Sequence, residues 1–248
     1  MNRTLNTIIA AIITLLVLVL ACSANWASSH EYLPAREGPD GIDISHHNGK
    51  INWKKVKDKC PDLSFVYIKC TEGATFVDPK FKANVEGARS QGYNVGGYHY
   101  FRMTSSAHDQ FAHFKQQLDG VDCNLIPMVD VEKNDGKTRE ELQDSLHVML
   151  DLLEAAYGVK PVLYGLNASY NRLCAPEFNG YTLYIGRYGD DSPVVTGAGR
   201  YAIWQYSISG IIKGIPQPVD LCRFHPDTDL EDILLPQDPT TPTIEVRQ

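Results

Sequence analysis

Two acidic residues lie two positions apart at the end of an apolar run, Ile126-Pro-Met-Val-Asp-Val-Glu132. Side chains alternate faces along a strand, so Asp130 and Glu132 would point the same way, with Val131 turned to the other side. Repulsion between two such carboxylates raises one pKa and keeps a proton on that group near neutral pH, as a general acid requires. A solvated pair at a strand end is the alternative. Strained acid pairs concentrate at functional sites, so we interpret this pair as catalytic.

Further acidic residues close other strand-like runs. Asp43 lies in Gly41-Ile-Asp-Ile44 and Asp220 in Pro218-Val-Asp-Leu221, where a turn or capping aspartate is the alternative. Glu72 ends another run, and there a solvated loop carboxylate is a strong alternative. Aromatic side chains accompany these strand ends, and we expect about half of them to line a cleft and the rest to fill the core. They are Tyr98, His99, Tyr100, Phe101, Tyr164, Trp204 and Tyr206.

Other site chemistries have weak support in the sequence. His46-His47 has no third ligand, and His108 and His113, five residues apart, do not share a helical face. The sequence has no nucleophile-elbow motif and no phosphate loop. We therefore expect no metal and no cofactor. The net charge of −7 comes without a basic patch, which argues against a nucleic-acid partner.

Strand and helix patterns alternate as far as Tyr164, after which helical patterns weaken. Asp78-Pro79 is typical of an N-cap followed by proline at the first helical position, opening a helix to about Ser90. Thr138-Arg-Glu-Glu141 is a capping box, followed by an apolar stripe of Leu142, Leu146, Met149, Leu150 and Leu153. About five βα units followed by three strands with few helices predict an α/β fold, a modified TIM-like barrel over 41–235. Active residues of such barrels lie at the carboxyl ends of the strands.

The two ends of the chain differ from this pattern. Residues 1–21 resemble a signal peptide, with an apolar run from Ile8 to Leu20 that is short for a membrane span. Val19-Leu-Ala-Cys22 resembles a bacterial lipobox and predicts lipidation of Cys22; cleavage after Ala24 and an uncleaved anchor are the alternatives. Residues 22–40 would be a tether and 236–248 a loose, disordered tail. We expect an exported cell-envelope lipoprotein, membrane-bound through its lipid and monomeric.

Seven segments, in this order and spacing, resemble glycoside hydrolase family 25, the Chalaropsis-type lysozymes. They are Gly41-Ile-Asp-Ile-Ser45, Phe65-Val-Tyr-Ile-Lys-Cys-Thr-Glu-Gly73, Gly96-Gly-Tyr-His-Tyr-Phe101, Pro127-Met-Val-Asp-Val-Glu132, Pro161-Val-Leu-Tyr164, Ile203-Trp-Gln-Tyr206 and Val219-Asp220. The resemblance implies cleavage of the β-1,4 bond between N-acetylmuramic acid and N-acetylglucosamine in peptidoglycan. Cys222 departs from it, because the family usually has asparagine there, and this leaves the local hydrogen bonding open.

The resemblance also implies roles for individual residues. Glu132 would be the proton donor, and Asp130 its partner, either as nucleophile or as stabiliser of a route that uses the substrate's own N-acetyl group. The implied substrate-binding residues are Asp43, Asp220, Tyr67, Tyr98, Tyr164 and Trp204. Two other functions fit the same residues: hydrolysis of another N-acetylhexosamine glycan, and glycan binding without catalysis by a surface lipoprotein. The intact acid pair argues against the second.

Overall fold

The computed structural model describes residues 38–236. The predicted signal peptide, the lipidation site Cys22, nearly all of the tether and the tail from residue 237 lie outside the described residues, so those predictions stay predictions. Within residues 38–236, no helix has the length and apolar character that crossing a membrane requires.

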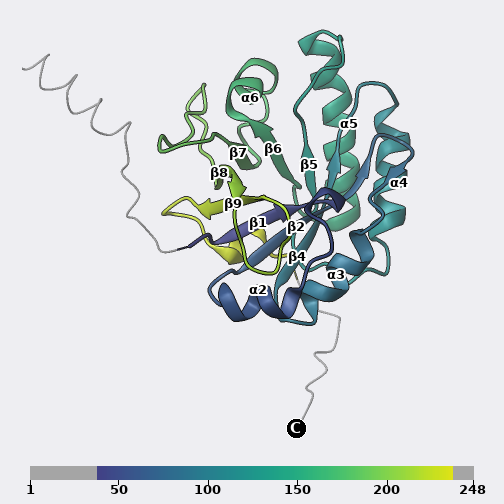
Figure 1. Cartoon of the computed structure of the whole chain (residues 1–248). Helices are drawn as coiled ribbons and strands as arrows, with labels where there is room; N and C mark the ends of the chain where they lie inside the picture. Colours follow the sequence, from purple (N-terminus) through teal and green to yellow (C-terminus); the bar gives the residue numbers. More distant parts are fainter. Residues whose placement is uncertain (1–37, 237–248) are drawn as a thin grey trace, which may run out of the picture. The chain divides into compact units, whose positions relative to one another are not determined.

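A closed barrel of eight strands forms the centre of the described domain (Figure 1). The strands follow one another around the barrel as β1-β9-β8-β7-β6-β5-β4-β2, and a parallel pairing of β1 with β2 closes it. The short strand β3 pairs with β2 at the edge, outside the closed ring. The strand bounds are β1 Gly41–Ile44, β2 Phe65–Glu72, β3 Phe76–Val77, β4 Asn94–Tyr100, β5 Met128–Asp130, β6 Val162–Leu166, β7 Thr182–Gly186, β8 Ile203–Gly210 and β9 Val219–Phe224.

Helical segments follow each of the first five barrel strands. They are η1 His46–Asn48 with α2 Trp53–Lys59 after β1, α3 Phe81–Arg89 after β2, α4 Ala107–Leu118 after β4, α5 Arg139–Tyr157 after β5 and α6 Asn167–Leu173 after β6. A last short helix, η2 (Leu230–Ile233), follows β9. Figure 1 shows α3, α4 and α5 outside the barrel beside β2, β4 and β5. The predicted barrel of five βα units and three further strands with few helices is therefore confirmed.

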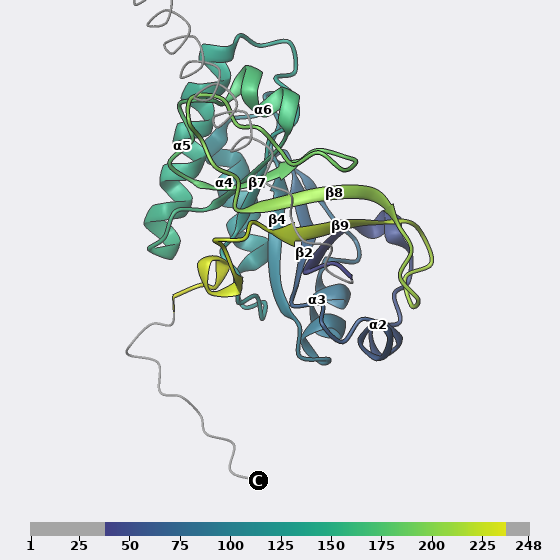
Figure 2. The ribbon, with the colours of Figure 1, turned by 90° about the vertical axis from the view of Figure 1, so that its left-hand side faces the viewer.

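One strand runs against the others. β9 is antiparallel to both of its neighbours, β8 and β1, whereas the remaining barrel pairs are parallel. A parallel crossover needs a dozen or more residues, and only residues 211–218 join β8 to β9, so the chain turns back as a hairpin. Figure 2 shows β8 and β9 side by side as a long ribbon. A TIM barrel has eight parallel strands, so β9 is an exception within the TIM-like barrel that the sequence predicted.

Two helix predictions had different outcomes. The capping box of α5 is present, with Thr138 and Glu141 bonded to each other's backbone, and the predicted apolar stripe is buried. The helix expected to open at Asp78 begins instead at Phe81, and its N-cap position, Lys80, makes no side-chain cap. Asp78 accepts hydrogen bonds from the backbone and ring of His46 (both 2.8 Å), so its carboxylate joins the loop after β1 to the loop before α3.

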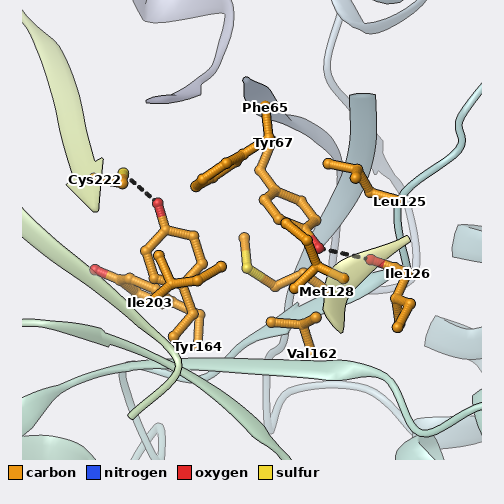
Figure 3. Packing of buried hydrophobic residues seen from close by; sticks show 11 residues of the cluster. Phe65, Tyr67, Leu125, Ile126, Met128, Val162, Tyr164, Ile203 and Cys222 are labelled. Atoms are coloured by element: carbon orange, nitrogen blue, oxygen red, sulfur yellow. Dashed lines mark hydrogen bonds between the residues drawn. The ribbon is translucent and has the colours of Figure 1, made fainter. Parts of the chain in front are cut away.

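Large aromatic and aliphatic side chains fill the barrel (Figure 3). Phe65 and Tyr67 of β2 meet Met128 of β5 there, with Tyr184 of β7 against the Tyr67 ring at a centroid distance of 6.1 Å. Gly96 leaves room for this packing, since an added Cβ would lie 2.5 Å from the Tyr67 ring. Packed side chains therefore close the barrel interior below the carboxyl ends of its strands.

Candidate active site

A small cleft of about 100 Å³ lies at the carboxyl ends of the parallel strands, above this core. It brings together six of the eight residues predicted for the site, from five different strands and the loop after β5. Its lining consists of Asp43, Tyr98, Met128, Asp130, Glu132, Tyr164, Tyr188, Gln205 and Asp220. A more open hollow of about 490 Å³ near the amino ends of β7 and β8 contains none of the predicted residues.

Asp130 is the buried member of the acid pair. It is 7% exposed, and its Oδ1 has no hydrogen-bond partner within the described residues. Burial raises the pKa of Asp130 well above its ordinary value, and the neighbouring charges of Glu132 and Asp43 raise it further. Glu132 lies just beyond the end of β5, where its Oε2 accepts a hydrogen bond from the Tyr100 hydroxyl (3.1 Å).

The sequence left open which carboxyl of the pair has the raised pKa. Repulsion was expected to raise one pKa of the pair, and the proton donor was expected to be Glu132. In the structure the pKa of Asp130 is raised. Burial of this carboxyl is the largest cause, and repulsion from neighbouring carboxylates is a smaller one. Glu132 is less deeply buried than Asp130.

A second acid pair lies across the cleft, where β1 and β9 place Asp43 opposite Asp220. Oδ2 of Asp43 accepts hydrogen bonds from the Tyr184 hydroxyl (2.7 Å) and from Nε2 of Gln205 (2.8 Å). Burial, followed by the charge of Asp43 and a hydrogen bond to it, raises the pKa of Asp220 to about 9. Asp220 is therefore protonated at neutral pH.

Cys222 belongs to the same buried network. Its thiol contacts Oδ2 of Asp43 (3.4 Å) and the hydroxyl of Tyr184. Burial raises the pKa of this thiol well above its ordinary value, so it is a neutral, weak donor. The sequence left the local hydrogen bonding at Cys222 open. In the structure, its thiol bonds to the carboxylate of Asp43 and to the backbone oxygen of Asp220.

Three further residues line the cleft and were not predicted for it: Met128, which belongs to the core cluster below, Gln205 and Tyr188. The Tyr164 hydroxyl donates to Oε1 of Gln205 (2.8 Å), so Gln205 links Tyr164 to Asp43. Tyr188, just after β7, is 46% exposed and contributes the accessible part of the wall. The alternation of β8 signals Gln205, because Ile203 faces the core and the residue two positions on faces the same way. No comparable signal marks Tyr188, which lies in a loop.

Two predicted residues lie away from the cleft. Tyr67 has no exposed surface, and its hydroxyl donates to the carbonyl oxygen of Ile126 (3.0 Å), as Figure 3 shows. Trp204 is 4% exposed, and its Nε1 donates to the backbone oxygen of Arg187 (2.6 Å). Its neighbours on β8, Ile203 and Gln205, face the barrel interior, so Trp204 faces outward. The substrate-binding role expected for these two residues does not fit their positions.

The site consists of carboxyl, hydroxyl and amide groups. Among residues 38–236, no cluster of three or more histidine, cysteine or acidic side chains is arranged to hold a metal ion. A carboxyl pair at the mouth of a barrel, with tyrosine and glutamine side chains around it, is the arrangement with which glycoside hydrolases carry out acid–base chemistry on sugars. The fold and the site together define this class.

Comparison with known proteins identifies the family. The model of glycosyl hydrolases family 25 matches residues 42–215. The uncharacterized protein YegX of Escherichia coli K12 is 33% identical over 196 residues, which cover 78% of this chain and 72% of that protein. Lysozyme M1 of Streptomyces globisporus is 30% identical over 203 residues, 76% of this chain and 68% of that protein. The chain belongs to glycosyl hydrolases family 25 and is a glycoside hydrolase.

Solved structures agree with this assignment. The family 25 glycosyl hydrolase of Bacillus anthracis superposes with a TM-score of 0.72 at 26% identity, covering 82% of this chain and 95% of that one. The bacterial lysozyme of Streptomyces coelicolor superposes with a TM-score of 0.69 at 29% identity, covering 77% of this chain and 93% of that one.

Proposed function

We propose that this enzyme is a lysozyme that cleaves the β-1,4 bond between N-acetylmuramic acid and N-acetylglucosamine in peptidoglycan, with Glu132 as the general acid. The observation that carries the proposal is the cleft itself, where Glu132 stands at the barrel mouth next to the buried Asp130. Relatives named as a lysozyme and as an N,O-diacetylmuramidase support the choice of bond. The cleft is polar and narrow, which suits a single sugar linkage held between its acids.

The reaction begins with proton transfer from Glu132 to the glycosidic oxygen. Before a sugar binds, burial and the charge of Glu132 favour the protonated form of Asp130. A sugar that covers Glu132 removes water from it, which favours the protonated form of Glu132. The proton can then pass to Glu132, leaving Asp130 ionised beside the anomeric carbon. Glu132, once deprotonated, activates the water that completes hydrolysis with net retention.

Asp130 has two possible tasks, as nucleophile or as stabiliser of the substrate's N-acetyl group. Its buried Oδ1 has no donor within the described residues, and the amide N–H of an N-acetyl group is a donor of the required type. Satisfying a buried acceptor in this way favours binding, because an unpaired buried polar atom is costly. We therefore favour the substrate-assisted route, in which the acetamido oxygen attacks the anomeric carbon and Asp130 holds the amide.

Product analysis tests the bond and the route. Digested peptidoglycan is reduced with borohydride and its fragments are weighed by mass spectrometry. We expect muramitol at the new ends; glucosaminitol ends, or turnover of chitin oligomers alone, would assign a different N-acetylhexosamine bond. For the route, glycan strands with their N-acetyl groups removed are compared with intact ones. Turnover that survives this removal would return Asp130 to the role of nucleophile.

We also propose that the enzyme is exported and acts at the cell envelope while attached through a lipid on Cys22. This rests on the lipobox-like segment ending at Cys22. Incorporation of labelled palmitate into the full chain, and its loss in Cys22→Ala, is the expected result. Unlabelled protein released into the medium with Asn25 as its first residue would favour cleavage after Ala24.

A further inference from the structure

Four charged side chains form a continuous chain of ion pairs beside the cleft, and we name them the clamp: Lys69, Glu72, Arg102 and Asp135. Nζ of Lys69 lies 2.7 Å from Oε2 of Glu72, whose Oε1 accepts from the Arg102 guanidinium at 2.8 Å. Two other nitrogens of the same guanidinium donate to the two oxygens of Asp135, both at 3.0 Å. The clamp therefore joins β2, the loop after β4 and the loop after β5.

The clamp differs from an ordinary surface ion pair. Its side chains are between 10% and 32% exposed, and the Arg102–Asp135 contact is bidentate. Asp135 also accepts a hydrogen bond from the backbone N–H of Met103 (2.9 Å). Hydrogen bonds from Arg102 hold the pKa of Asp135 below its usual value. Isolated exposed pairs contribute little, but a connected and partly buried network restrains the segments that it joins.

Both ends of the clamp lead to Glu132. Strand β5 ends at Asp130, so the ladder of the sheet does not include Glu132. Asp135 lies three residues further on and has a left-handed backbone (φ 47°), a conformation that its side-chain bonds help to hold. At the other end, the Lys69 ammonium lies 4.9 Å from the centre of the Tyr100 ring, whose hydroxyl donates to Glu132.

We propose that the clamp is a positioning device that holds Glu132 in the orientation for proton donation, with Asp135 and Arg102 as its principal residues. The proposal rests on the proposed role of Glu132 as acid. The clamp fixes the loop that carries Glu132 from one side and the hydroxyl that bonds its carboxylate from the other. A rigid surrounding shell is what a catalytic group beyond the end of a strand needs, because small misplacements cost large factors in rate.

Asp135→Asn is the test variant. Asparagine has nearly the same shape and tolerates a left-handed backbone, so the change removes charge from the clamp without adding strain. Asp122→Asn is the matched control, because it breaks another Arg–Asp pair, Arg89 to Asp122 at 3.0 Å, outside the cleft. We expect Asp135→Asn to lower kcat about 10- to 100-fold, with KM within about twofold, whereas Asp122→Asn keeps both.

Hydrogen exchange provides a readout that does not depend on turnover. Amides of residues 131–137 are expected to exchange faster in Asp135→Asn than in wild type, with unchanged exchange there in Asp122→Asn. Equal exchange in the two variants, or a kcat of Asp135→Asn within twofold of the control, would overturn the clamp.

The failure of the acid assignment has a separate signature. Near-wild-type turnover by Glu132→Gln would show that Glu132 is not the general acid. A loss of kcat in Asp135→Asn would then act through another group, and the proposal that the clamp positions Glu132 would be wrong. If Glu132→Gln is inactive, and Asp135→Asn lowers kcat and speeds amide exchange in residues 131–137, both proposals stand.

Discussion

Replacing Asp220 by asparagine changes how the stability of the enzyme depends on pH. In the folded protein the pKa of Asp220 is raised to about 9, whereas an aspartate in an unfolded chain titrates near pH 3.9. Between these values the folded state binds a proton at Asp220 that the unfolded state has lost. The stabilisation linked to this proton is complete below about pH 4 and is lost as pH rises toward 9. The asparagine of the variant cannot titrate, and its amide can still donate to Asp43.

The magnitude follows from proton linkage. One group in this window lowers the free energy of unfolding by up to about 1.4 kcal/mol for each pH unit. The limit between pH 5 and pH 7 is therefore about 2.7 kcal/mol. Asp220 is only partly buried, so solvent screening reduces this value, and we expect about 1–2 kcal/mol. Asp220→Asn should gain this amount relative to wild type as pH rises from 5 to 7.

Urea unfolding at pH 5, 6 and 7, at constant ionic strength, measures the difference. Glu72 and Asp135, whose pKa values are lowered, are present in both proteins and cancel in the comparison. Asp58→Asn, at an exposed ion pair with Lys54, is the control and should stay parallel to wild type. Parallel curves for Asp220→Asn and wild type would refute the assignment of the buried proton to Asp220.

Three further predictions concern residues whose positions the structure defines. Tyr67→Phe loses the hydrogen bond to Ile126 and is expected to lower the free energy of unfolding by about 1–2 kcal/mol, with KM unchanged. A raised KM would show that Tyr67 contacts the substrate. Tyr188→Ala should raise KM several-fold and change stability by less than about 0.5 kcal/mol, because the ring is half exposed in the cleft; an unchanged KM would remove it from the substrate contact. Gln205→Leu removes the acceptor of the Tyr164 hydroxyl and one of the donors to Asp43, and should destabilise by about 1–3 kcal/mol; a smaller loss in urea unfolding would contradict the buried network.

The order of strands and the acids at their ends could be predicted from local pattern alone. Asp130 and Glu132 close an apolar strand, and Thr138 with Glu141 marks the next helix, so short-range chemistry decides both. The direction of β9 could not be predicted in this way. It depends on the short connection after β8, and nothing in the six residues of β9 specifies the direction of the strand.

The two misplaced aromatics show what a sequence pattern leaves out. Alternation gives the face of a strand, but not the height of a side chain within a staggered barrel. Tyr67 faces inward and lies beside Asp43 in register, yet its ring turns down to Ile126 and away from the cleft. Trp204 lies next to the inward-facing Ile203 and so faces outward. Predicting this requires knowing which residues of β8 face the barrel interior.

The sequence could not predict which carboxyl groups have raised pKa values, for a similar reason. Spacing shows that Asp130 and Glu132 are neighbours, so repulsion between them was predictable. Spacing does not show burial, which is the largest cause of the raised pKa of Asp130. The same holds for Asp220, whose pKa is raised first by burial and then by Asp43 across the antiparallel pairing of β1 and β9.

Digestion of purified peptidoglycan by Glu132→Gln, beside wild type and Asp122→Asn, tests the central claim most directly. Glutamine keeps the shape of the side chain and its bond to Tyr100 but cannot donate a carboxyl proton. General acid–base catalysis contributes about 10²- to 10⁴-fold, so release of muramitol-ended fragments should fall by at least about 100-fold, with unfolding free energy within about 1 kcal/mol of wild type. Near-wild-type release of the same fragments by Glu132→Gln would contradict the account.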